Sequence, residues 1–225
     1  MILVVNAIPD SAVLAAIAER IALLEWRDGR ETAGATARAV KRNEQAVMDG
    51  PAGRALREEL GRIVADHPVV RAAALPRRLS PLLISRTGVG GGYGAHVDNA
   101  LMGRGDRRLR TDLSFTLFLT PPGDYDGGEL AIHASGAVQE IKAEAGSMVL
   151  YPSGAIHEVR PVTRGTRIAC VGWIESLIAD AGRRELLFDL ENLRVDLRRQ
   201  LPGQSAELLT LDKTIANLLR MWARA

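Results

Sequence analysis

The chain contains few of the residues that mark several common classes of protein. Its 225 residues include one cysteine, Cys170, so a disulfide within the chain is excluded, and its place in the apolar run 168–174 predicts a buried, inert thiol. No apolar run approaches the ~20 residues that a membrane-spanning helix needs. The apolar start, residues 1–5, is short and has no basic segment before it, which argues against a signal peptide. We therefore expect a cytoplasmic protein without a membrane partner.

Lysine is also scarce, because three of the 29 basic residues are lysines and the rest are arginines. Four arginines gather in one short stretch, where they could meet an anionic substrate or a nucleic acid. They are Arg104, Arg107, Arg108 and Arg110. Asp106 and Asp112 dilute this cluster, and no aromatic side chains alternate with it to stack on bases. We predict a solvated loop and do not expect a nucleic-acid partner.

Histidine is the third scarce residue, and its four copies limit the possible metal sites. Residues 93–98 read Tyr-Gly-Ala-His-Val-Asp. Side chains alternate between the two faces of a β-strand, so His96 and Asp98 are expected to project from the same face. His157 lies in a second strand-like stretch, 155–161, and can supply a third ligand. Two imidazoles and one carboxylate form a facial triad with three open positions, which suits non-haem Fe(II) enzymes that use O2.

The other two histidines give weaker alternatives. His67 stands before a proline at a predicted helix end, where a histidine is commonly an ordinary terminal residue. His133 could complete an all-histidine site with His96 and His157, as in some cupin-like proteins. We favour the simpler interpretation of His133 as an exposed strand residue.

The spacing of apolar residues changes its period twice along the chain. Helical spacing predicts helices in the first quarter, with a cap at Asp10 or Ser11 and Pro51 in a first helical turn. Short alternating stretches separated by glycine, proline and serine then predict strands from residue 79 to 175. One of them, 113–120, has a strongly apolar face. Many short, closely spaced strands favour a sandwich or barrel.

Helical spacing returns after Glu175. Four leucines are predicted to share one side of a helix, and Ser205 can cap a last helix. The leucines are Leu186, Leu190, Leu193 and Leu197. The predicted organisation is a mainly β core, 79–175, with an N-terminal helical segment, 1–78, that packs on it, followed by C-terminal helices, 176–225. These C-terminal helices could also build a homodimer.

Turn geometry suggests that an arginine lies near the histidines. A hairpin closing around residues 161–165 would pair His157 with Arg167, although a bulge at Gly165 would shift the register by one. A guanidinium beside a metal with three open positions suits a ligand that chelates iron at one end and carries a carboxylate at the other. 2-Oxoglutarate is such a molecule.

Nearly the whole chain resembles the bacterial PKHD-type hydroxylases, a branch of the prolyl 4-hydroxylase-like Fe(II)- and 2-oxoglutarate-dependent dioxygenases. The segments that carry the resemblance are 93–100, 112–119, 125–130, 150–153, 161–167 and 218–223. The resemblance implies a double-stranded β-helix, a jelly roll of the cupin-like kind. It implies that His96, Asp98 and His157 bind iron and that Arg167 binds the far carboxylate of 2-oxoglutarate. It also implies L-ascorbate as the helper reductant and O2 as a substrate.

One position departs from the family pattern, which commonly has an aromatic residue where this chain has Thr87. Tyr93 or Tyr151 could help to position the cosubstrate instead. A nucleic-acid demethylase of the same superfamily is a weaker match. That group has a second arginine six positions after the first, and here the position six residues after Arg167 is Trp173.

The resemblance predicts an enzyme that couples decarboxylation of 2-oxoglutarate to succinate with hydroxylation of an unidentified substrate, either a small molecule or a protein side chain. Related bacterial proteins suggest a link to iron uptake and homeostasis. Two alternatives remain: a metal-dependent enzyme on a cupin-like barrel that does not use oxygen, and a non-catalytic iron or 2-oxoglutarate sensor that acts through a partner protein.

Overall fold

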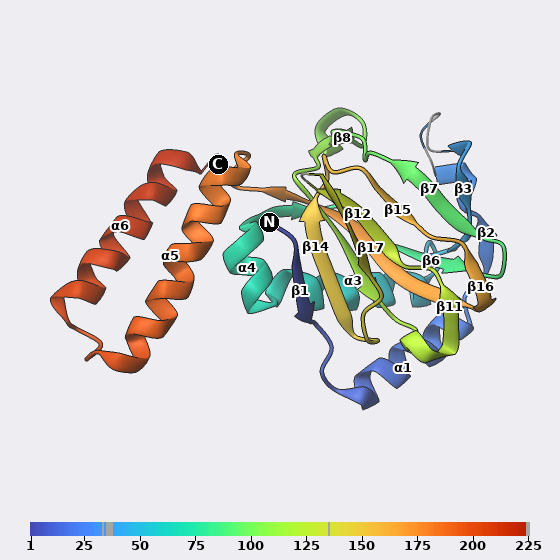
Figure 1. The fold of residues 1–225 in the computed structure, drawn as a ribbon, viewed down its shortest axis with the longest axis horizontal. Coiled ribbons are helices and arrows are strands. Elements are labelled where there is room, and N and C mark those ends of the chain that lie inside the picture. Colours follow the sequence, from blue (N-terminus) through green and yellow to red (C-terminus); the bar gives the residue numbers. More distant parts are fainter. Residues whose placement is uncertain (33, 35–37, 135, 224–225) are drawn as a thin grey trace.

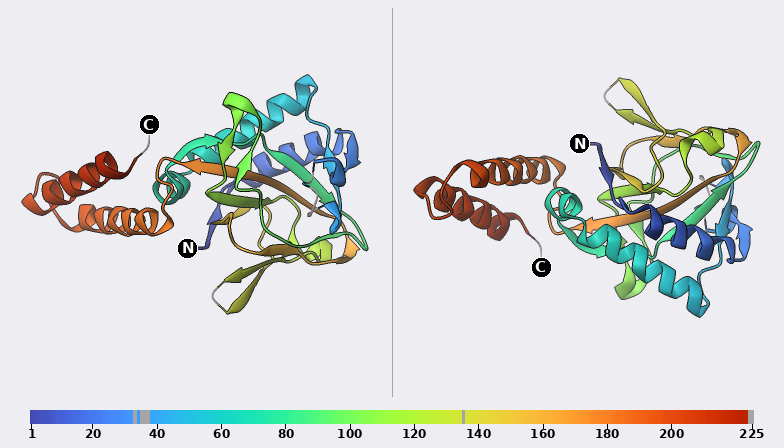
Figure 2. Two further views of the ribbon diagram at one scale, coloured as in Figure 1. Left: turned by 90° about the horizontal axis from the view of Figure 1, so that it is seen from above. Right: turned by 90° about the horizontal axis from the view of Figure 1, so that it is seen from below.

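The computed structural model describes residues 1–225 except 33, 35–37, 135 and 224–225. Two antiparallel β-sheets face each other, two helices cover the outer face of the larger sheet, and a pair of C-terminal helices projects to one side (Figures 1 and 2). This confirms the prediction of a mainly β core with flanking helices. In the described part of the chain, no helix is long and apolar enough to cross a membrane.

The larger sheet has the strand order β1-β14-β10-β17-β6-β4-β2, with β5 paired to β17. Its strands are β1 (Leu3–Asn6), β2 (Trp26–Asp28), β4 (Glu44–Ala46), β5 (Pro76–Leu79), β6 (Leu83–Thr87), β10 (Leu113–Phe118), β14 (Ser147–Pro152) and β17 (Arg167–Ser176). The smaller sheet has the order β13-β12-β15-β7-β3. Its strands are β3 (Lys41–Arg42), β7 (Gly92–His96), β12 (Leu130–Ala134), β13 (Ala137–Ile141) and β15 (His157–Val159).

Two short ribbons complete the strands: β8 (Leu101–Met102) with β9 (Leu109–Arg110), and β11 (Tyr125–Gly127) with β16 (Val162–Gly165). The α-helices are α1 (Ser11–Ala22), α3 (Pro51–Asp66), α4 (Pro68–Ala74), α5 (Ala181–Gln200) and α6 (Ala206–Trp222). Single 3-10 turns lie at Gly29–Thr32, Gly105–Arg107 and Pro122–Asp124.

The N-terminal segment contains the predicted helices but is not helical throughout. Asp10 caps α1 by accepting a hydrogen bond from the Ala12 amide, and Pro51 begins α3, as predicted. Strands β1, β2 and β4 nevertheless belong to the larger sheet, and β3 belongs to the smaller one. Each has two to four residues, which is too short to show a clear alternation of apolar residues. The N-terminal residues are therefore part of the β core.

Strand β10 lies in the middle of the molecule and is buried on both faces. Phe115 and Leu117 pack with the helices in the main hydrophobic core, which also contains Leu56 and Leu60 of α3. The predicted apolar face of this strand is thus confirmed. Its other face carries two small hydroxyl side chains and Phe118, all of them buried, and Phe118 packs with apolar residues of the smaller sheet.

The two C-terminal helices form as predicted, and Ser205 caps α6 by accepting a hydrogen bond from the Leu208 amide. The predicted leucine stripe on α5 is wrong in part. Leu187 is the buried leucine, whereas Leu186 and Leu193 are each 48% exposed. The reason is that α5 contacts α4 and α6, and the direction of these partners, not the spacing of the leucines, decides which face is covered.

Candidate active site

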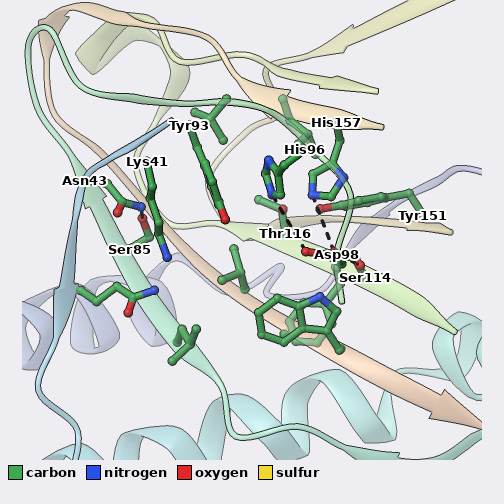
Figure 3. A pocket seen from close by; sticks show the side chains of 18 of the residues that line it. Lys41, Asn43, Ser85, Tyr93, His96, Asp98, Ser114, Thr116, Tyr151 and His157 are labelled. Carbon is green, nitrogen blue, oxygen red and sulfur yellow. Dashed lines mark hydrogen bonds and ion pairs between the residues drawn. The ribbon is translucent and has the colours of Figure 1, made fainter. Parts of the chain in front are cut away.

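Three of the predicted site residues come together between the sheets. His96 is the last residue of β7, and His157 begins β15 directly opposite it in antiparallel register. Asp98 lies two residues beyond the end of β7, so the ligand strand that was expected to carry both side chains ends at His96, but the Asp98 carboxylate still lies beside His96. Asp98 Oδ1 is 3.9 Å from His96 Nε2, and Asp98 Oδ2 is 3.7 Å from His157 Nε2 (Figure 3).

Hydrogen bonds behind these side chains fix their orientation. His96 Nδ1 donates to the Gly94 carbonyl at 2.9 Å, and His157 Nδ1 donates to the Ala155 carbonyl at 3.0 Å. With the proton on Nδ1, each Nε2 presents its lone pair towards Asp98. The Ser114 hydroxyl donates to Asp98 Oδ2 at 2.6 Å. Ser114 was not predicted from the sequence, where its only distinguishing feature is that it is a small polar residue within the apolar strand 113–120.

The His96 imidazole is held in the neutral form that a metal requires. Burial and, next, the neighbouring His157 lower the pKa of His96 to about 4. Among the described residues, His96, Asp98 and His157 are the group whose ligand atoms, all within 4.8 Å of one another, could hold a metal ion. Two nitrogen donors and one carboxylate leave three positions open, so the donor set fits Fe(II).

The two tyrosines proposed from the sequence flank the histidines. The Tyr93 ring stacks on His96 with centroids 3.7 Å apart, and the Tyr151 ring meets His157 edge-on at 5.0 Å. Burial raises the pKa of Tyr93 to about 12, and burial followed by the charge of Asp98 raises the pKa of Tyr151 above its usual range. Both hydroxyls therefore stay protonated and can donate hydrogen bonds.

Arg167 lies on the opposite wall, at the start of β17, and is 2% exposed. Its Nε and Nη2 have no hydrogen-bond partner among the described residues. Burial lowers the pKa of Arg167, and electrostatic interactions with Tyr125 and Tyr151 counteract the shift. A buried guanidinium with unsatisfied donors is unfavourable unless an anion joins it. Arg167 therefore fits the carboxylate of 2-oxoglutarate.

The predicted hairpin between His157 and Arg167 is wrong. Strands β15 and β17 belong to different sheets, and the residues between them form β16, which pairs with β11. The two side chains share a cavity because the sheets face each other, not because their strands are neighbours. Arg167 therefore does lie across the same cavity from the histidines, as expected, but the packing of the two sheets and not a hairpin brings it there.

A cavity of about 430 Å³ lies between the sheets and is lined by all six predicted site residues. Thr87, the residue found in place of an aromatic one, is buried, lines the cavity and pairs in register with Arg167. Ser114 and Thr116 of β10 and Trp173 of β17 also line it.

The remaining histidines and arginines lie elsewhere. His133 Nε2 is 3.6 Å from Glu158 and half-exposed, and His67 separates α3 from α4, as the simpler interpretations predicted. In the arginine cluster, Arg104 and Arg108 are exposed, and Arg110 forms an ion pair with Asp112. The side chain of Arg107 lies outside the described part of the chain. The described arginines of this cluster are not among the residues that line the cavity.

Two family models match the sequence. Residues 82–175 match the 2OG-Fe(II) oxygenase superfamily, and residues 181–224 match the PKHD-type hydroxylase C-terminal domain. A PKHD-type hydroxylase of Hyphomonas neptunium is 53% identical over 98% of this chain and 99% of its own length. Another, of Synechococcus elongatus, is 46% identical over 99% of this chain and 100% of its own length.

Solved structures share the fold at low identity. A prolyl hydroxylase of Trichoplax adhaerens has a TM-score of 0.59 at 15% identity and covers 78% of this chain and 83% of its own. A Pseudomonas putida prolyl-4-hydroxylase has a TM-score of 0.53 at 22% identity, over 78% of this chain and 92% of its own. HygX of Streptomyces hygroscopicus, solved with nickel and 2-oxoglutarate bound, has a TM-score of 0.54 at 15% identity, over 79% of this chain and 84% of its own.

Proposed function

Because the chain belongs to the PKHD-type hydroxylases of the 2OG-Fe(II) oxygenase superfamily, we propose that His96, Asp98 and His157 hold its Fe(II) and that Arg167 holds the far carboxylate of 2-oxoglutarate. The observation that carries this assignment is the buried triad facing, across one cavity, a buried arginine with unsatisfied donors. The enzyme is a 2-oxoglutarate-dependent dioxygenase, and ascorbate is typical for its family.

Iron and 2-oxoglutarate, when bound, supply the oxygen chemistry that hydroxylates a C–H bond and releases succinate and CO2. The protein's own residues place these groups. Ser114 and the backbone carbonyls behind the two histidines hold the three ligands in position before the metal arrives. Tyr93 and Tyr151 offer protonated hydroxyls to the cosubstrate. The side chains of His96, Asp98 and His157 are only 6–8% exposed, which strengthens the charge interactions among them.

A non-catalytic sensor is not favoured, since the full-length relatives are hydroxylases. A cytoplasmic location, a link to iron homeostasis and a homodimer stay predictions. Exposed Leu193, Leu209 and Met221 on the C-terminal helices are consistent with a homodimer, which light scattering of the purified chain would test.

Succinate release provides the direct test. Purified protein is loaded anaerobically with Fe(II) and 2-oxoglutarate, O2 is admitted, and succinate is measured for the wild type, for His157→Ala and for the matched control His133→Ala. We expect succinate from the wild type and the control and none from His157→Ala. Loss of activity in both variants, or in neither, would overturn the assignment of His157.

A further inference from the structure

The indole group of Trp173 carries a hydrogen-bond donor that no described residue uses. Trp173 belongs to β17, and its side chain lines the cavity. Its indole Nε1 is buried and has no hydrogen-bond partner in the described part of the chain, whereas its backbone amide donates to the Ser80 hydroxyl at 3.0 Å. An indole nitrogen can donate but not accept, and a buried donor without an acceptor is unfavourable. The cavity therefore favours a ligand that brings an acceptor to this position.

Strand pairing places Trp173 beside the residues that contact the proposed metal ligands. Ser114 of β10 lies directly opposite Tyr151 of β14 on one side and Trp173 on the other, and residues paired in this way project from the same face of a sheet. The Ser114 hydroxyl donates to Asp98 at 2.6 Å. The Tyr151 ring meets His157 edge-on (Figure 3). Two members of this row thus contact metal ligands, and Trp173 is the third member.

The proposed cosubstrate site lies at the other end of the same strand face. Arg167 and Trp173 are six residues apart in β17, so their side chains project from one face, with about 20 Å of strand between them. Arg167 is 2% exposed, whereas Val97, which precedes Asp98 and also lines the cavity, is 49% exposed. The cavity is thus closed near Arg167 and reaches the surface near Asp98. With 2-oxoglutarate at the inner end, the N–H of Trp173 is left to the substrate.

The surroundings of this N–H favour an uncharged acceptor. The donor itself is uncharged, and so are three residues close to Asp98 in the chain that also line the cavity. They are Val97, Asn99 and Met102. The two cations among the described lining residues have other interactions, because Arg167 is assigned to the cosubstrate and Lys41 interacts with the charge of Asp98. A carboxylate placed against an indole N–H would lose water without gaining a cation, whereas an amide oxygen would lose far less.

We propose that Trp173 donates its indole N–H to an amide carbonyl oxygen of the substrate and so selects substrates in which that carbonyl lies close to the C–H bond that is hydroxylated. The assignment rests on the proposed function, because the triad defines where the reacting carbon must lie. Trp173 is then a specificity-determining residue. Small amides and polypeptides both carry such a carbonyl group, and probes of both kinds separate the two sources.

Nuclear magnetic resonance of the indole N–H groups tests this contact directly. The chain has three tryptophans, so the ¹⁵N-labelled protein gives three indole signals, and the signal that is missing in Trp173→Phe belongs to Trp173. The protein is saturated with Zn(II), as a diamagnetic substitute for iron, and with 2-oxoglutarate. It is then titrated with butanamide, butanoate and butanamidinium. These three probes have the same shape, but they differ in charge, and butanamidinium has no acceptor.

We expect butanamide to shift the Trp173 proton signal downfield in a saturable manner, to bind more tightly than butanoate, and to leave the other two indole signals in place. Butanamidinium should not shift the Trp173 signal. Trp173→Phe keeps an aromatic ring but removes the donor. It should weaken butanamide binding, followed through the signals of the probe, by roughly 2- to 12-fold, as expected for one hydrogen bond between uncharged groups. A trialanine peptide blocked at both ends should bind more tightly than butanamide if the source of the carbonyl is a polypeptide, and less tightly if it is a small amide.

Trp222→Phe is the matched control, because it makes the same change on α6, where the Trp222 ring faces Arg183 and is not among the described residues that line the cavity. It should bind butanamide as the wild type does. If Trp173→Phe does not fold, Trp26→Phe and Trp222→Phe assign the remaining signal to Trp173.

Four results would overturn the proposal: an unmoved Trp173 signal in the presence of butanamide, an equal shift with butanamidinium, tighter binding of butanoate, or undiminished butanamide binding by folded Trp173→Phe. Failure to bind Zn(II) and 2-oxoglutarate at the outset would instead count against the proposed function.

Discussion

Replacing Arg167 with methionine should affect ligand binding but not folding stability, because Arg167 and Arg184, the two most buried arginines among the described side chains, differ in their partners. Arg167 has two donors without a partner among the described residues. Arg184 is also buried, but its Nη1 donates to the carbonyls of Ile178 and Ala179 at 2.7 and 2.8 Å. We therefore expect the Arg167 side chain to bind a ligand and the Arg184 side chain to stabilise the fold.

The expected magnitudes follow from these contacts. Losing one partner of a buried, hydrogen-bonded charge pair costs roughly 2–4 kcal/mol, so Arg167→Met should weaken 2-oxoglutarate binding by about 30- to 1,000-fold. The same variant should not lower the stability of the ligand-free protein, because it replaces an unsatisfied buried cation with an apolar side chain. Arg184→Met should cost roughly 1–3 kcal/mol of folding stability, since it leaves buried carbonyls without donors.

Thermal unfolding and calorimetry together give the test. Melting temperatures are compared with and without Mn(II) and 2-oxoglutarate, and the dissociation constant of 2-oxoglutarate is measured for each folded variant. We expect the ligands to raise the melting temperature of Arg167→Met little or not at all. Arg184→Met should melt at a lower temperature than the wild type without ligands but should still be stabilised by them. If Arg167→Met bound 2-oxoglutarate normally, or destabilised the ligand-free protein as much as Arg184→Met does, the reasoning would be refuted.

Two further predictions concern the fold. A Cβ atom at Gly172 would lie 2.8 Å from the Phe115 ring, whereas one at Gly61 would meet nothing within 4 Å. In urea unfolding, Gly172→Ala should therefore lower the free energy of unfolding by roughly 1–3 kcal/mol, and Gly61→Ala should raise it by roughly 0.5–1 kcal/mol. Equal effects of the two substitutions would contradict this prediction. Burial alone would raise the pKa of Glu175, but the hydrogen bond and charge of Arg78 lower it below 4.5. The stabilisation is present at neutral pH and is lost as pH falls below 4.5. Glu175→Gln should therefore be less stable than the wild type at pH 7 and should lose less stability than the wild type when the pH is lowered. If the free energy of unfolding of the two proteins changed with pH in parallel, the prediction would be wrong.

Local patterns in the sequence indicated the class of the fold and most residues of the candidate site. The caps at Asp10 and Ser205 act within one turn of their helices, so they could be identified without knowledge of any other segment. The same holds for the apolar face of 113–120, because alternation along a strand is a property of that strand alone. His96, Asp98 and His157 were found because few histidines exist and their residue types match one kind of metal site.

Only the tertiary structure decided how these parts meet. Arg167 reaches the cavity because β15 and β17 lie in facing sheets, which the length of the intervening turn could not reveal. The sequence did not indicate that Lys41 lines the cavity. A strand of two residues has no periodicity, and its pairing with β7 joins residues that are far apart in the chain. Which face of α5 is covered likewise depended on where its partners lie. Sequence spacing specifies which side chains share one face of an element, but long-range packing specifies what that face meets.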